Sequence, residues 1–106
     1  MLDTLQRNFD QASQAYCEAN GIVRDTDWFI LKLQEEVGEL TQAWNKVSGR
    51  GRRHGEPTDD LRRNLEDEAA DVLGHVFLLA EAQGLDLRAA IARKWRFVVE
   101  EPTSGP

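Results

Sequence analysis

The sequence predicts an all-α protein, an antiparallel helical hairpin within a four-helix bundle. Apolar residues recur at helical spacing in four stretches, and Gly, Pro and capping residues separate these stretches. A chain of 106 residues builds only a modest core, so we expect oligomerisation to complete the bundle. Residues 1–100 are expected to form a single helical domain and residues 101–106 a disordered tail.

The amino-acid composition limits which kinds of molecule this protein is expected to bind and where it is expected to work. The net charge of −6 argues against nucleic acid or an anionic membrane as the partner. No apolar run approaches the roughly 20 residues that a membrane-spanning helix needs. Cys17 is the single cysteine and cannot form an internal disulfide, so we expect a reducing compartment, the cytoplasm.

The first two helices are predicted over residues 2–20 and 27–48. The first ends at Gly21 and carries one apolar face with Cys17 beside it as a buried small side chain. Asp25 or Thr26 can cap the second helix. The apolar face of the first helix comprises Leu2, Leu5, Phe9, Ala12, Tyr16 and Ala19.

Residues 49–57 form the main break in composition, a Gly- and Arg-rich stretch that ends in Pro57. We expect a mobile basic loop here. Its Arg50, Arg52 and Arg53 are either simply solvated or close over a polyphosphate, since arginine suits bidentate contact with phosphate oxygens.

Two further helices follow this loop. Thr58 marks the start of the third, which runs to about Gln83 and stops at Gly84. Asp86 caps the fourth, which ends before Pro102. The apolar stripe of the fourth helix comprises Leu87, Ile91, Trp95 and Val98.

The second and third helices each carry two acids three residues apart: Glu36 with Glu39, and Glu68 with Asp71. Residues at that spacing share one helix surface, where like charges repel. We take Ile30, Leu33, Val37, Leu40, Trp44 and Val47 as the packing stripe of the second helix, and Leu61, Leu65, Ala69, Val72, Val76 and Leu79 as that of the third.

At about 100° per residue, each acid pair lies about 65–130° to one side of its stripe, in the same rotational sense. Glu39 and Glu68 are also equally far from the turn between the helices. A hairpin packed stripe to stripe therefore brings all four carboxylates to one flank at one height. Oxygen ligands of this kind predict a hard divalent cation.

Side chains beside the acids suggest substrate contacts, each with a plainer structural alternative. Lys32 forms either an exposed ion pair with Glu36 or a contact to the acids or a phosphate. Trp28 either stacks on a nucleobase or packs on another helix. His75 is either a polar neighbour of the site or a phosphate or base contact. Trp44 and Trp95 are expected in the core.

The pattern Glu35-Glu36-x-x-Glu39 followed by Glu68-x-x-Asp71 resembles the signature of the MazG-like all-α nucleoside triphosphate pyrophosphohydrolases. The likeness extends from Leu31 to Lys94. It implies that Glu36, Glu39, Glu68 and Asp71 bind Mg²⁺, for which Mn²⁺ can substitute. It also implies that Lys94 contacts phosphate and that the bundle is a homodimer or homotetramer. Some relatives carry an Asn shortly after that lysine, whereas this chain has Arg96, Phe97 and Val98.

The resemblance implies an enzyme that hydrolyses a (deoxy)nucleoside triphosphate to the monophosphate and pyrophosphate, in a role of nucleotide-pool house-cleaning. Glu35, next to the ligands and rotated outward, is the candidate general base; otherwise it is a solvated glutamate. Two alternatives stay open. One is a phosphoribosyl-ATP pyrophosphohydrolase, and the other is a non-catalytic helical binding module that uses the acids for metal-linked assembly.

Overall fold

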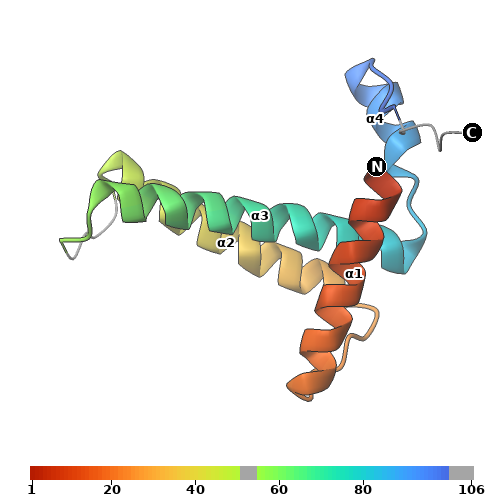
Figure 1. Cartoon of the computed structure of the whole chain (residues 1–106), viewed down its shortest axis with the longest axis horizontal. Coiled ribbons are helices and arrows are strands. Elements are labelled where there is room, and N and C mark those ends of the chain that lie inside the picture. The colour runs from red at the N-terminus through yellow and green to blue at the C-terminus, as the bar shows by residue number, and fades with distance from the viewer. Residues whose placement is uncertain (51–54, 101–106) are drawn as a thin grey trace, which may run out of the picture. The chain divides into compact units, whose positions relative to one another are not determined.

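The computed structural model describes residues 1–50 and 55–100, and within them it is all-α, as predicted. The helices are α1 (Leu2–Ala19), α2 (Trp28–Ser48), α3 (Thr58–Gln83) and α4 (Leu87–Trp95) (Figure 1). No helix in the described part is long and apolar enough to cross a membrane. The chain divides into two compact units: a hairpin unit, Asp25–Val76, and a terminal unit made of Met1–Arg24 and the chain from Phe77 onward.

The hairpin unit consists of α2 and the first part of α3, which run antiparallel side by side (Figure 1). The carboxylate of Asp25 accepts a hydrogen bond from the Trp28 amide at 2.9 Å, which satisfies a free donor of the first turn. At the other end Gly49 adopts a left-handed conformation with φ 85°, and the amide of Arg50 donates to the carbonyl of Asn45 at 2.8 Å. Arg52 and Arg53 lie outside the described residues.

The face of α2 that meets α3 differs from the predicted stripe. The buried residues of α2 are Phe29, Glu36 and Ala43, each seven residues after the last. On α3, Leu61 is buried and Leu65, Glu68 and Val72 are partly buried, whereas Ala69 is exposed. The acids were expected on a flank of the hairpin, but Glu36 and Glu68 lie on the faces that become buried.

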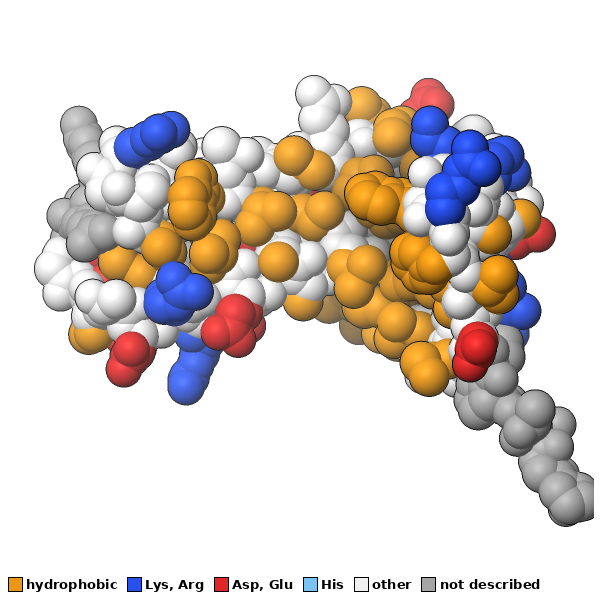
Figure 2. Space-filling view, turned by 90° about the horizontal axis from the view of Figure 1, so that it is seen from above, with side chains coloured by type: hydrophobic (Ala, Val, Ile, Leu, Met, Phe, Trp, Pro, Cys, Tyr) orange, Lys and Arg blue, Asp and Glu red, His pale blue; other side chains and the backbone are white. Residues whose placement is uncertain are grey.

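The packed side of α2 was predicted wrongly because this helix is apolar on more than one side. Ile30, Val37 and Trp44, which we expected in the core, are 49%, 45% and 50% exposed. Figure 2 shows hydrophobic side chains at the surface along the hairpin. The exposed large hydrophobic residues of this unit are Ile30, Leu31, Val37, Trp44 and Leu73.

In the terminal unit, α1 packs on the last turns of α3. The rings of Phe9 and Phe77 stack with centroids 5.7 Å apart, and Cys17 is buried as predicted. Tyr16, which we placed on the packed face of α1, is 64% exposed instead. Gly21, at φ 66°, ends this helix region as expected, and the amide of Ile22 returns to the carbonyl of Cys17.

The fourth helix is shorter than predicted. Asp86 caps it as expected, since its carboxylate accepts a hydrogen bond from the Ala89 amide at 3.0 Å. The helix ends at Trp95, where Arg96 turns into the left-handed region, so Val98 lies beyond it. Trp95 is 75% exposed and does not belong to the core.

Candidate metal centre

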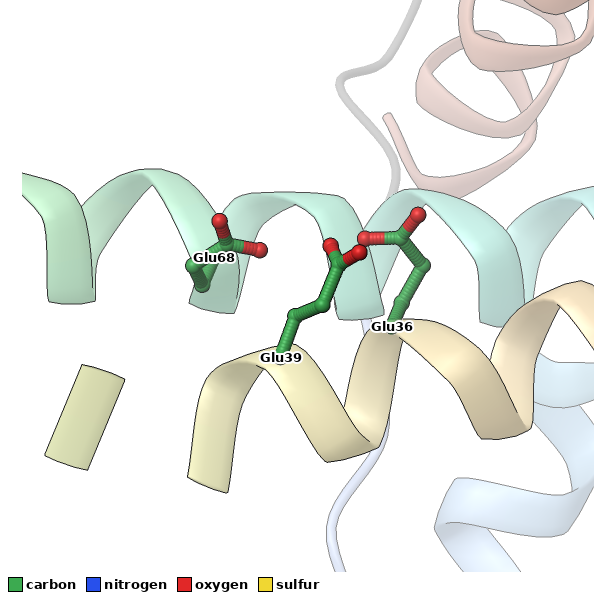
Figure 3. A group of neighbouring side chains, drawn as sticks. All are labelled: Glu36, Glu39 and Glu68. Atoms are coloured by element: carbon green, nitrogen blue, oxygen red, sulfur yellow. The ribbon is translucent and has the colours of Figure 1, made fainter. Parts of the chain in front are cut away.

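Three carboxylates from two helices converge in the hairpin unit. Glu36 and Glu39 lie one turn apart on α2, and Glu68 faces them from α3 (Figure 3). One oxygen from each lies within 4.8 Å of the others. We call these three residues the acid cluster. Because a divalent cation with oxygen ligands sits 2.0–2.6 Å from each, oxygens at such separations can share one ion.

The acid cluster is partly shielded from solvent by the two helices. The side chain of Glu36 is only 8% exposed, and Glu39 and Glu68 are partly buried. Within the part of the chain that the structure describes, Oε2 of Glu36 and Oε2 of Glu68 are buried without a hydrogen-bond partner. Buried carboxylate oxygens are normally paired or bound to a cation, so these two atoms are candidate ligands for one.

Burial and mutual repulsion make the charged form of the acid cluster unfavourable. Burial first, and then the charge of Glu39, raise the pKa of Glu36 to about 7. The same causes, burial and then Glu39, raise the pKa of Glu68. Asp71 adds to both shifts. A cation bound among these oxygens would remove the repulsion and hold the carboxylates ionised.

Lys32 bridges two of the α2 acids. Its ammonium nitrogen donates to Oε2 of Glu35 at 3.4 Å and lies 3.8 Å from Oε1 of Glu36. Partial burial opposes the charge of Lys32, but the Glu35 hydrogen bond and the neighbouring acids outweigh it, so its pKa is raised. Lys32 therefore lies beside the acid cluster, and its contact with a phosphate stays a prediction. Glu35 itself is 57% exposed in its side chain.

His75 and Trp28 lie beside the acid cluster, at the end of the hairpin unit away from the basic loop. Nε2 of His75 is 4.0 Å from Oε1 of Glu36, and its ring is tilted against Trp28 with centroids 6.0 Å apart. Burial, and then the charge of Lys32, lower the pKa of His75. Phe29 meets the Trp28 ring edge-on at 5.2 Å. We did not single out Phe29 from the sequence. Its seven-residue spacing to Glu36 places both residues on the same side of α2.

Two of the remaining predicted site residues, Asp71 and Arg50, lie outside the acid cluster. Asp71 is exposed and is not one of the converging carboxylates, although its charge reaches Glu36 and Glu68. Arg50 is exposed at the end of α2. Lys94 is exposed on α4, in the terminal unit.

Comparison with known families gives a match to the MazG nucleotide pyrophosphohydrolase domain over residues 25–96, which is more than half of the chain. The chain belongs to the MazG family. The matched residues contain the whole hairpin unit and all three members of the acid cluster. Membership of the MazG family indicates nucleotide pyrophosphohydrolase activity in general terms. Neither the comparison with curated proteins nor that with solved structures found a match.

Proposed function

We propose that this protein is a Mg²⁺-dependent enzyme that hydrolyses (deoxy)nucleoside triphosphates to monophosphate and pyrophosphate, in nucleotide-pool house-cleaning. One observation carries the proposal: carboxylate oxygens from two helices converge within 4.8 Å. Two of these carboxylates each keep a buried oxygen without a partner in the described residues. Oxygen-only ligands favour Mg²⁺, or Mn²⁺ in its place, over softer metals.

Glu36, Glu39 and Glu68 would hold the cation. Asp71 would join them from the same helix as Glu68 once its exposed side chain turns inward. Bound there, the cation would offset the negative charge of the phosphates and of the leaving pyrophosphate. The cation would also let a polyphosphate approach the carboxylates of this net acidic protein of charge −6.

The chain's own residues would supply the rest of the reaction. A water oxygen bonds to the α-phosphorus, the bond from that phosphorus to the bridging oxygen breaks, and pyrophosphate leaves with the bonding electrons. Glu35 is exposed, borders the cluster and would accept the proton from water. Lys32 would contact phosphate from the same helix face, and Trp28 would stack on the base. Arg50 and Lys94 remain proposed phosphate contacts, together with Arg52 and Arg53 outside the described residues.

We also propose that the protein works as a homodimer or homotetramer. Ile30, Val37 and Trp44 follow one another at seven-residue spacing on α2 and are about half exposed. A helix side of this kind in a monomer is a surface for another helix. A second copy of the hairpin unit would cover it and complete a bundle around the acids.

The experiment is an assay of a panel of nucleoside triphosphates, deoxynucleoside triphosphates and phosphoribosyl-ATP with Mg²⁺, read out separately for pyrophosphate and orthophosphate. We expect pyrophosphate and monophosphate from triphosphates, and loss of both in Glu39→Gln and Asp71→Asn with helical content retained. Turnover of phosphoribosyl-ATP alone would establish the narrower enzyme. Mg²⁺-dependent association without any turnover would replace the enzyme by a binding module, and orthophosphate as the sole product would overturn the assigned bond.

A further inference from the structure

The two carboxylate oxygens of Glu36 have different surroundings. Oε1 faces two nitrogens, Nζ of Lys32 at 3.8 Å and Nε2 of His75 at 4.0 Å. Oε2 is buried and has no hydrogen-bond partner among the described residues. The side chain is therefore divided, with one oxygen turned toward nitrogen donors and the other left for a ligand.

The two neighbours of Oε1 are held differently. Lys32 reaches it from the preceding turn of the same helix and also donates to Glu35, so its long side chain is shared. His75 approaches from α3, with a side chain only 17% exposed. Its ring is in tilted contact with the ring of Trp28. A ring in contact on one side with an indole has few alternative positions, so His75 is the more rigid neighbour of Oε1.

We propose that His75 is a positioning residue for metal binding: its Nε2 holds Oε1 of Glu36 so that Oε2 points at the cation. This inference rests on the proposed function of the acid cluster as a metal centre. At 4.0 Å the contact is longer than a hydrogen bond. It shortens to one when Glu36 swings to bind, because ligand carboxylates are themselves oriented by hydrogen bonds from outer groups. His75 touches neither the phosphates nor the reacting water in this role.

Three substitutions of His75 distinguish the contribution of its Nε2 atom from the contribution of ring packing. Glutamine places an amide nitrogen near the position of Nε2, asparagine places one near Nδ1, and phenylalanine keeps a ring against Trp28 with no nitrogen. The measurement is Mn²⁺ affinity of the purified full chain without nucleotide, by calorimetry and by electron paramagnetic resonance. Thermal unfolding without metal is recorded for each variant, and Asn64→Ala, at an exposed position on α3, serves as the control.

We expect His75→Phe and His75→Asn to weaken Mn²⁺ binding by about 10–100-fold, the loss typical of removing an outer-sphere partner. His75→Gln and Asn64→Ala should stay close to wild type, and metal-free unfolding should be little changed. If His75→Phe does not fold, the difference in Mn²⁺ affinity between His75→Gln and His75→Asn decides.

Equal affinity in all variants would overturn the proposal. An equal loss of Mn²⁺ affinity in His75→Gln, His75→Asn and His75→Phe, with a lower metal-free unfolding temperature, would also overturn it, because that result indicates a packing role alone. These failures differ from failure of the proposed function, in which the wild-type chain neither binds Mn²⁺ nor releases pyrophosphate.

Discussion

Glu39 on α2 and Glu68 on α3 bring carboxylate oxygens within 4.8 Å of each other across the hairpin. Burial first, and then the charge of Glu39, raise the pKa of Glu68, as expected for two acids held close together. A helix pair that places like charges in its own interface loses stability there. A cation bound between these acids would recover that loss, so we expect stability and metal binding to be coupled in this protein.

Removing one charge from the acid cluster should stabilise the metal-free protein. We expect Glu39→Gln to raise the metal-free unfolding temperature, because Glu39 contributes to the raised pKa of both Glu36 and Glu68. The same variant should lose the rise in unfolding temperature that Mg²⁺ produces in wild type. At a 100-fold excess of Mg²⁺ over Kd, this rise corresponds to about 2.7 kcal/mol of added unfolding free energy. Differential scanning fluorimetry with and without Mg²⁺ measures both. Glu66→Gln, on an exposed position of α3, is the matched control and should keep the shift.

Stability of the metal-free protein should fall as pH rises from about 4.5 to 7. Glu36 has its pKa raised from 4.5 to about 7 in the folded state, so in that window the folded protein binds more protons than the unfolded chain. The contribution is absent below pH 4.5 and fully destabilising above pH 7, on the order of 1–3 kcal/mol.

Glu36→Gln tests this dependence, because the amide does not titrate. Denaturant unfolding at pH 5 and pH 7.5, with a chelator present, should show a smaller difference between the two pH values in the variant than in wild type. Equal pH dependence in both proteins would mean that Glu36 ionises in the fold as it does in the unfolded chain.

Glu35→Gln should separate chemistry from metal binding. The Glu35 side chain is 57% exposed and lies outside the acid cluster, so its loss should leave the unfolding temperature and Mn²⁺ affinity within error. If it accepts the proton from water, kcat should fall by about 10²–10⁴-fold. Steady-state kinetics with the best triphosphate gives the answer, and an unchanged kcat would return Glu35 to the status of a solvated residue. Glu66→Gln again serves as the control and should leave kcat unchanged.

Trp44→Arg should prevent self-association. The Trp44 side chain is half exposed on α2, so a charged residue there disrupts a contact with a second copy more than the hairpin itself. Light scattering after gel filtration should change from a multiple of 12.0 kDa to the single-chain mass, with the circular dichroism of a helical protein retained. Gln42→Arg, at an exposed polar position of the same helix, should leave the mass unchanged. A single-chain mass for the wild type would remove the prediction.

Much of the local structure follows from the sequence because its causes are local. The ends of the helices depend on residues such as Asp86, whose carboxylate caps α4, and Gly49, whose left-handed φ closes α2. Thr58 and Gln83 bound α3 as expected. The fourth helix was predicted too long, because the apolar pattern gives no indication of the left-handed turn at Arg96 that ends it.

The sequence by itself determined the number of helices, the pairing of α2 with α3 as a hairpin, and the acidic turns that meet at one height. Only the tertiary structure decided which side of α2 faces α3. Periodicity fixes the spacing of a stripe, but α2 has one apolar stripe through Ile30 and Val37 and another buried line through Phe29 and Ala43. The second line contains Glu36, and rotation toward it brought Glu36, Glu39 and Glu68 together while leaving Asp71 exposed.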